Sequence, residues 1–286
     1  WNQNAITVAG GHEQGSRSNL LKYPYDLFID NRNNLYVADR SNHRIQKWST
    51  DAKEAQTVAG GNREGSSANQ LWYPSSIYVD YNENLYIADS WNRRIQLWTK
   101  GASNGSTIVQ GIQSYGIYLD KDSNLYVSDY DNHQITKWFS PRYEINKIVA
   151  GNGIKGSDAN RLSRPHGIFV DDNYNIYVAD KGNNRVQKWS RHSLNGITVA
   201  SSGLNSPVSV TVDCHDNIYI SDFERHRIQK FSSDPTSGVT IAGSGTEGDN
   251  SNQLAYPWGV KLDSNGNIYI ADQFNHRIQK FEINRY

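Results

Sequence analysis

The chain has 286 residues, in which 29 lysines and arginines balance 29 aspartates and glutamates. This neutrality argues against nucleic acid as a partner, because nucleic-acid binders usually carry a basic excess or stripe. The single cysteine, Cys214, excludes an intrachain disulfide and a thiolate zinc cluster. No apolar run approaches the ~20 residues of a membrane-spanning helix.

The start of the sequence bears on the compartment. The sequence begins at Trp1 and contains no methionine, which is compatible with removal of a leader segment. One glycosylation sequon, Asn104-Gly105-Ser106, falls in a predicted exposed hairpin. We therefore expect an extracellular protein.

The first predicted element is a strand at about residues 5–10, which precedes a segment that recurs six times. Each copy has an Asp-x-x-x-Asn turn, an apolar strand of the form aliphatic-Tyr-aliphatic-small-Asp, and a charged strand ending in Trp or Phe. A fourth strand follows in most copies. The aspartates that end the apolar strands are Asp39, Asp89, Asp129, Asp180, Asp222 and Asp272.

These aspartates are 50, 40, 51, 42 and 50 residues apart. A period of roughly 40–50 residues that contains only short strands is typical of a β-propeller blade. We predict an all-β fold, one closed domain over residues 1–286 with no linker. Its six blades are expected at about residues 24–60, 74–110, 114–150, 165–200, 207–242 and 257–281.

The last copy shows how the local sequence builds a blade. Residues 259–263 alternate apolar and polar, and residues 264–267 form a turn rich in residues that tolerate positive φ. Residues 268–272 are almost continuously apolar, as in a strand buried on both faces. The copy ends at Phe281 without a fourth strand, so we predict that residues 5–10 complete this blade and close the ring.

The runs Asn-His-Arg-Ile-Gln-Lys-Trp at residues 42–48 and Asn-His-Arg-Ile-Gln-Lys-Phe at residues 275–281 resemble the NHL repeat, together with the Tyr-x-Ala-Asp before them. The resemblance covers all six copies and hence nearly the whole chain. It implies a six-bladed β-propeller of four-stranded antiparallel blades, independently of the count of strands.

Residues that recur in every copy are predicted to be structural. Asp30 and Asn34 belong to a tight turn in which short polar side chains bond to the neighbouring backbone. Asp39 lies five residues before Arg44, a spacing that favours a buried ion pair across a hairpin. The recurring histidines lie on separate blades and should diverge around the ring, unlike a metal site; they are His43, His133, His226 and His276.

Function is predicted where the copies differ. The innermost strand follows a proline in five copies, and the next residue should point to the mouth of the central channel. Aromatic faces and hydrogen-bonding groups at such a mouth suit a sugar ring or a small polar ligand. The predicted ligand-binding residues are Tyr25, Asp26, Ser75, Tyr115, His166 and Trp258.

We expect Tyr25, Tyr115 and Trp258 to stack on the ligand, while Asp26, Ser75 and His166 supply hydrogen bonds. A second interpretation is that these side chains only plug the channel. Long Gly-, Asn- and Ser-rich loops precede copies one, two, four and six and form an uneven rim, which is suited to a protein partner.

The alternative to a recognition domain is a metal-dependent enzyme, because some enzymes have a similar fold. Peptidyl-α-hydroxyglycine amidating lyases, which are similar propellers, hold zinc with Pro-His motifs on separate inner strands, and only Pro165-His166-Gly167 matches here. Asp26 and His166 are too few for the divalent-ion site of a related lactonase. We therefore expect no cofactor and no metal, and we favour a non-catalytic recognition propeller over a metal-dependent lactonase-, hydrolase- or lyase-like enzyme.

Two further interpretations stay open. Six near-equal blades are compatible with a lectin-like binder that repeats a weak site between blades. Some NHL propellers resemble RNA readers with a basic face, which the neutral charge of this chain does not favour. The oligomeric state is not predicted.

Overall fold

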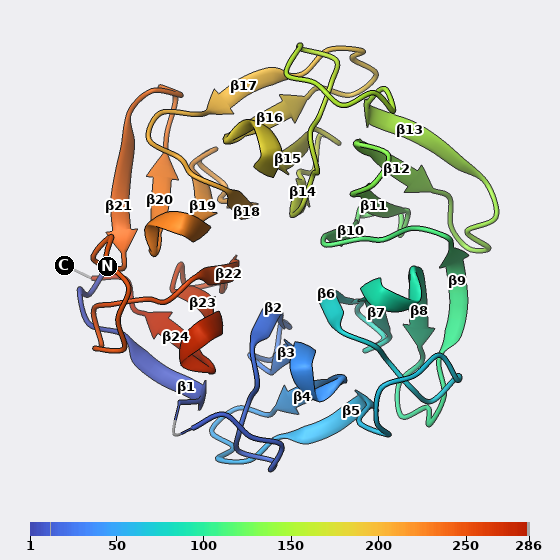
Figure 1. The fold of residues 1–286 in the computed structure, drawn as a ribbon, viewed down its shortest axis with the longest axis vertical. Coiled ribbons are helices and arrows are strands. Elements are labelled where there is room, and N and C mark those ends of the chain that lie inside the picture. The colour runs from blue at the N-terminus through green and yellow to red at the C-terminus, as the bar shows by residue number, and fades with distance from the viewer. Residues whose placement is uncertain (12, 285–286) are drawn as a thin grey trace.

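The structure is a computed structural model, and it describes residues 1–11 and 13–284. Over these residues, 24 strands form six four-stranded antiparallel sheets, arranged as blades around a central axis (Figure 1). The prediction of a six-bladed β-propeller is therefore confirmed.

The blades have the following bounds. Blade 1 contains β2 (Pro24–Ile29), β3 (Leu35–Asp39), β4 (Arg44–Trp48) and β5 (Gln56–Gly60). Blade 2 contains β6 (Pro74–Val79), β7 (Leu85–Asp89), β8 (Arg94–Trp98) and β9 (Ser106–Gln110). Blade 3 contains β10 (Ile117–Leu119), β11 (Leu125–Asp129), β12 (Gln134–Trp138) and β13 (Asn146–Gly151). Blade 4 contains β14 (Ile168–Val170), β15 (Ile176–Asp180), β16 (Arg185–Trp189) and β17 (Ile197–Ala200).

Blade 5 contains β18 (Pro207–Val212), β19 (Ile218–Asp222), β20 (Arg227–Phe231) and β21 (Gly238–Ala242). Blade 6 contains β22 (Pro257–Leu262), β23 (Ile268–Asp272), β24 (Arg277–Phe281) and β1 (Ile6–Gly10). Short 3-10 helices follow the second strand of five blades: η1 (Arg40–Asn42), η2 (Ser90–Asn92), η3 (Lys181–Asn183), η4 (Phe223–Arg225) and η5 (Gln273–Asn275). None of the helices in the described residues is long and apolar enough to cross a membrane.

The N-terminal strand closes the ring as predicted. β1 pairs antiparallel with β24, from Ile6 opposite Lys280 to Gly10 opposite Arg277. In Figure 1 the first and last segments of the chain accordingly lie in one blade. Blade 6 thus has four strands like the other five blades, and β24 is paired on both sides, with β1 and with β23.

The apolar pattern of each repeat becomes packing between blades. Every residue of β3 is buried, as expected for a middle strand covered on both faces. The aromatic residue that ends the third strand packs in the same layers, with Trp48 and Leu27 in one buried cluster and Trp98 and Ile77 in the next. Large flat side chains therefore fill the wedge between neighbouring sheets.

The recurring aspartates have the structural roles that the sequence predicts. The Asp30 carboxylate accepts hydrogen bonds from the backbone N–H of Asn34 at 2.8 Å and from its side chain at 2.7 Å. Asp39 is fully buried and accepts from Arg44 Nε at 2.7 Å, and Arg44 also donates to the carbonyl of Leu20 at 3.0 Å. Each Asp–Arg pair thereby fixes the loop that leads into its own blade.

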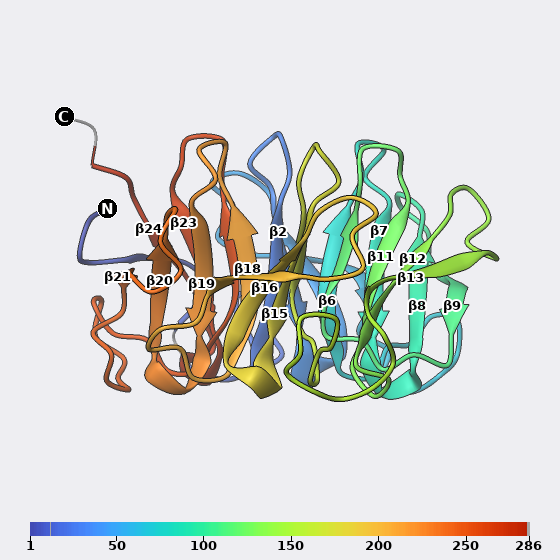
Figure 2. The same ribbon diagram turned by 90° about the horizontal axis from the view of Figure 1, so that it is seen from above.

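The ring has two faces, which Figure 2 shows edge-on. We call the turn face the side with the hairpins between the first and second strands, at residues 30–34, 80–84, 120–124, 171–175, 213–217 and 263–267. We call the loop face the opposite side, which carries the 3-10 helices and the loops that lead into the innermost strands. The predicted ligand-binding residues belong to the loop face.

Candidate functional site

The six predicted residues converge on the channel at the loop face. Tyr25 and Asp26 are the second and third residues of β2, and Ser75 and Trp258 are the second residues of β6 and β22. Tyr115 and His166 lie two residues before β10 and β14. In every blade the chain enters the innermost strand here, so side chains from blades far apart in sequence meet around one axis.

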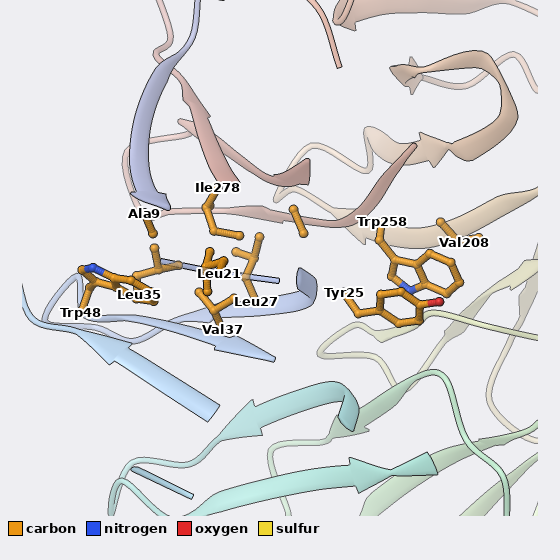
Figure 3. Packing of buried hydrophobic residues seen from close by; sticks show 11 residues of the cluster. Ala9, Leu21, Tyr25, Leu27, Leu35, Val37, Trp48, Val208, Trp258 and Ile278 are labelled. Carbon is orange, nitrogen blue, oxygen red and sulfur yellow. The ribbon is translucent and has the colours of Figure 1, made fainter. Parts of the chain in front are cut away.

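Four of these residues form a ring cluster, which we call the mouth cluster. Tyr25 stacks on Trp258 with ring centroids 3.9 Å apart, and Tyr115 stacks on His166 at 4.7 Å. The two stacks touch, with 5.5 Å between the centroids of His166 and Trp258. Figure 3 shows Tyr25 and Trp258 face to face beside Val208, away from Leu21, Leu27 and Val37.

The mouth cluster is closely packed. Trp258 is 5% exposed and His166 is 2% exposed, and only Tyr115 is half-buried. The space beside the cluster, which Tyr115, Trp258 and Asp26 line, measures about 10 Å³, enough for a single water molecule at most. The ring faces that we expected to stack on a ligand therefore contact one another here, as in the second interpretation of a plugged channel.

The polar members hold neighbouring blades together. Ser75 Oγ donates to the carbonyl of Ser114 at 2.7 Å, and Asp26 accepts from Ser76 Oγ at 2.6 Å. The second oxygen of Asp26 lies 3.8 Å from Lys261 Nζ, so this carboxylate links blades 1, 2 and 6.

His166 is a neutral imidazole. Burial lowers its pKa to about 3, and the nearby positive charges of Lys181 and Arg164 act in the same direction. His166 Nδ1 donates to the carbonyl of Arg164 at 3.0 Å, because a carbonyl can only accept. This assignment leaves Nε2 as the acceptor.

Two cations at the mouth were missed by the sequence analysis. The guanidinium of Arg40, in η1, lies 4.3 Å from the ring centre of Tyr25 and 4.4 Å from that of Tyr73. Lys181 Nζ, in η3, lies 5.7 Å from the ring centre of Trp258. Arg40 and Lys181 thus flank the Tyr25–Trp258 stack on its two sides.

Neither cation has a carboxylate within 4 Å among the described residues. Arg40 Nε is buried and has no hydrogen-bond partner there. Burial lowers the pKa of Lys181, against the attraction of Glu224. A sequence signal for both existed, because they directly follow the repeated aspartate, where other copies have uncharged residues: Ser90, Tyr130, Phe223 and Gln273.

The described residues contain no group of three or more His, Cys, Asp or Glu side chains that could hold a metal ion. At the mouth, His166 is surrounded by Tyr115, Tyr130 and Trp258, whose rings supply no strong metal ligands. The arrangement of unpaired cations on aromatic rings is instead suited to hold a negatively charged group.

A ring of six four-stranded blades with a channel along its axis defines the chain as a β-propeller. The NHL repeat family matches residues 21–48, 162–189, 204–231 and 254–281. The chain is therefore an NHL-repeat protein, and blades 2 and 3 complete the ring with the same four-stranded architecture. No curated protein matches the sequence.

Solved structures that resemble the chain share its fold at low sequence identity. An auxiliary nutrient binding protein from Bacteroides thetaiotaomicron is 14% identical, with a TM-score of 0.73, over 96% of this chain and 75% of that one. Virginiamycin B lyase from Staphylococcus aureus is 11% identical, with a TM-score of 0.64, over 96% and 89%. A gluconolactonase from Xanthomonas campestris is 12% identical, with a TM-score of 0.70, over 92% and 86%. These similarities establish the propeller fold alone.

Proposed function

We propose that this propeller is a non-catalytic recognition domain that binds a small polar ligand with a negative charge, such as an acidic sugar, at the loop-face mouth. The observation that carries the proposal is the pair of cations, Arg40 and Lys181, on the two sides of the Tyr25–Trp258 stack. Neither has a carboxylate within 4 Å in the part of the chain that the structure describes. A half-buried cation without a counterion is a costly arrangement unless a ligand supplies the opposite charge.

The mouth cluster forms a rigid surface below the proposed ligand. The stack on Trp258 and the interblade bond of the adjacent Asp26 fix the position of Tyr25, and the ring of Tyr25 in turn supports the Arg40 guanidinium. A planar guanidinium held in one place can donate two parallel hydrogen bonds to a carboxylate with little loss of entropy. In this proposal the ligand lies on the cluster and does not enter the channel.

The rim beside Arg40 offers an aromatic surface. Trp91 is 50% exposed, and its ring centre lies 5.0 Å from that of Tyr73, the ring that covers the second face of the guanidinium. A sugar ring could pack on Trp91 while its carboxylate reaches Arg40. The same exposed aromatic and arginine side chains also suit a protein partner, which is the second form of the proposed recognition role.

An extracellular location is part of the proposal. The description of similar structures as auxiliary nutrient binding proteins supports a recognition role of this kind. Carbohydrate is the first ligand class to test. An acidic sugar has both a ring that can pack on an aromatic side chain and a carboxylate that can bind a cation.

The test is isothermal titration calorimetry with the methyl glycosides of galacturonic acid and of galactose. We expect the acidic glycoside to bind more tightly, and Arg40→Gln to weaken it about ten- to hundredfold, because a charged hydrogen-bonded pair contributes about 1.5–3 kcal/mol. Arg142→Gln, at an exposed arginine in the loop between β12 and β13, is the control. Equal binding of both glycosides, or equal loss in both variants, would contradict the proposal.

Native mass spectrometry before and after a chelator separates this function from the metal-dependent alternative. A recognition domain of the proposed type should have the mass of the bare chain under both conditions. One retained divalent ion per chain would contradict the non-catalytic assignment and favour a lactonase-like enzyme.

A further inference from the structure

The opposite end of the channel has a hollow that the proposed function does not use. It lies at the turn face, between the hairpins of blades 1, 2, 3 and 4, and measures about 430 Å³. This volume falls in the range of pockets for small ligands. We call it the turn-face hollow; in Figure 2 the hairpins that surround it are the loops along the upper edge.

Aromatic rings form the wall of this hollow on one side. The residue two places before the repeated turn aspartate is aromatic in four consecutive blades: Phe28, Tyr78, Tyr118 and Phe169. Their ring centres follow one another at 4.9, 5.2 and 5.2 Å, and the first three line the hollow. Blades 5 and 6 have Thr211 and Lys261 at this position, so the aromatic arc is confined to the side where the hollow lies.

The arc presents rings and hydroxyls together. Tyr78 and Tyr118 are half-buried, and neither hydroxyl has a hydrogen-bond partner among the described residues. Burial, with smaller contributions from Tyr81, Asp80 and Asp120, raises the pKa of Tyr78 to about 12. Both rings therefore stay neutral at physiological pH and keep the negative electrostatic potential of their faces without a fixed charge.

The rim of the hollow carries more negative charge than its own cations neutralise. Two of the lining carboxylates are paired, Glu83 with Arg32, Lys47 and Lys100, and Asp120 with Lys137. Four others have no cation within 4 Å among the described residues: Asp30, Asp80, Asp171 and Asp172.

The two cations of the lining are already engaged. Arg32 pairs with Glu83 at 3.0 Å, and Lys121 Nζ donates to the backbone carbonyl of Asp172 at 3.0 Å. Lys121 keeps its charge, but the four unpaired carboxylates outnumber it. The walls of the hollow thus combine aromatic rings with a net negative field, and both attract a positive charge.

We propose that the turn-face hollow binds a small organic cation, an alkylammonium or quaternary ammonium compound. The aromatic arc favours an organic cation over a hydrated metal ion, because ring faces replace the hydration shell of a soft ammonium and not that of a divalent ion. Tyr81, which is 95% exposed on the turn of blade 2, extends the aromatic surface to the rim. The size of the hollow suits a free small molecule and not a folded partner.

The probe is choline, compared with 3,3-dimethyl-1-butanol, its uncharged isostere. Titration calorimetry of the full chain should show saturable binding of choline and none of the alcohol. Equal binding of the two compounds would mean that the hollow recognises shape and not charge, and would overturn the proposal. Absence of saturable choline binding would overturn it as well.

Variants locate the binding in the hollow. Tyr118→Leu should weaken choline binding about fivefold and Tyr118→Phe should retain it, because the phenylalanine keeps the ring face. Asp172→Asn removes one unpaired carboxylate of the rim and should also weaken binding. Asp216→Asn, an exposed aspartate in the equivalent hairpin of blade 5 that does not line the hollow, is the matched control.

Three results would contradict the assignment to this site. The first is equal loss of choline binding in Asp172→Asn and Asp216→Asn, and the second is full retention in Tyr118→Leu when this variant is folded. The third is tighter capture of a lysine-containing peptide than of choline, which would make the hollow a peptide site. Arg40→Gln belongs to the loop face and should leave choline binding unchanged, so failure of this inference is distinguishable from failure of the proposed function.

Discussion

Single histidines connect one blade to the next. His43 Nδ1 accepts a hydrogen bond from the backbone N–H of Tyr73 at 3.1 Å, and His276 Nδ1 accepts one from Tyr23 at 3.2 Å. These bonds need the neutral imidazole with Nδ1 unprotonated. Blade 4 makes the same connection with an amide, since Asn184 Oδ1 accepts from Ser206 at 2.8 Å.

This connection predicts a pH dependence of stability. Burial lowers the pKa of His43 and His276 below the ordinary value of about 6.5, so the folded state disfavours their protonated form. Their contribution to the free energy of unfolding is therefore complete above that value and is lost as the pH falls below it. The double variant His43→Asn/His276→Asn should flatten the decline between about pH 7 and pH 5, measured by urea denaturation. An identical decline in the variant and the natural chain would refute this role.

At the scale of the element, five of the six blades are fixed to their leading loops by an Asp–Arg pair. In blade 2, Arg94 Nε donates to the fully buried Asp89 at 2.7 Å, and the same guanidinium donates to the carbonyls of Ser66, Ser67 and Gln70. Burial raises the pKa of Asp89, and its hydrogen-bond donors, Arg94 among them, oppose this rise. Blade 3 has Gln134 instead, and no 3-10 helix follows its second strand.

Breaking one pair should therefore be costly. Arg94→Leu leaves the Asp89 carboxylate buried without its cation and should lower the free energy of unfolding by about 3–5 kcal/mol. Arg93→Leu is a control in the adjacent position, where the side chain is exposed and pairs with Asp131; surface pairs contribute at most about 1 kcal/mol. Equal effects of the two substitutions on the free energy of unfolding, measured by urea denaturation, would show that the buried pair stabilises the fold no more than the surface pair.

β1, the strand that closes the ring, ends at a glycine. Gly10 has a φ of +66°, and a Cβ there would lie 2.3 Å from the carbonyl oxygen of His276, the residue directly before β24. Gly111 has a φ of +92° with open space around it. Both Gly→Ala changes incur the backbone strain of about 1–2 kcal/mol, and only Gly10→Ala adds the collision. We expect Gly10→Ala to lower the melting temperature at least twice as much, and a similar decrease in both variants would contradict this account of closure.

At the scale of the whole molecule, the sequence predicts those features that depend on neighbouring residues or on repetition. The period-2 strands, the Asp-x-x-x-Asn turns and the unpaired strand at residues 5–10 predicted six blades and their closure, because each depends on neighbouring residues or on repetition. The stack of Tyr25 on Trp258 was not predictable, since it joins blades 1 and 6 and depends on how far apart the ring sets them.

The arc of Phe28, Tyr78 and Tyr118 was visible in the sequence as a position that differs between copies, but only the fold shows that it borders a hollow. The same applies to Arg40 and Lys181, because only the fold shows that no carboxylate of the described residues lies within 4 Å of either cation. Positions that are the same in every repeat serve packing within and between blades, while the role of positions that differ becomes visible only in the folded ring.

Among residues 1–11 and 13–284 the channel is therefore polarised, with cations that lack an ion pair at the loop face and carboxylates that lack one at the turn face. The two mouths are separated by the length of the innermost strands, and the packed mouth cluster lies at one end. Substitutions at sites this far apart, with no shared partner, normally act additively. The double variant Arg40→Gln/Asp172→Asn should thus bind the acidic glycoside like Arg40→Gln and choline like Asp172→Asn. A coupling energy above about 1 kcal/mol between the two sites, measured by calorimetry over the full cycle, would show that the mouth cluster rearranges when the turn-face hollow is filled.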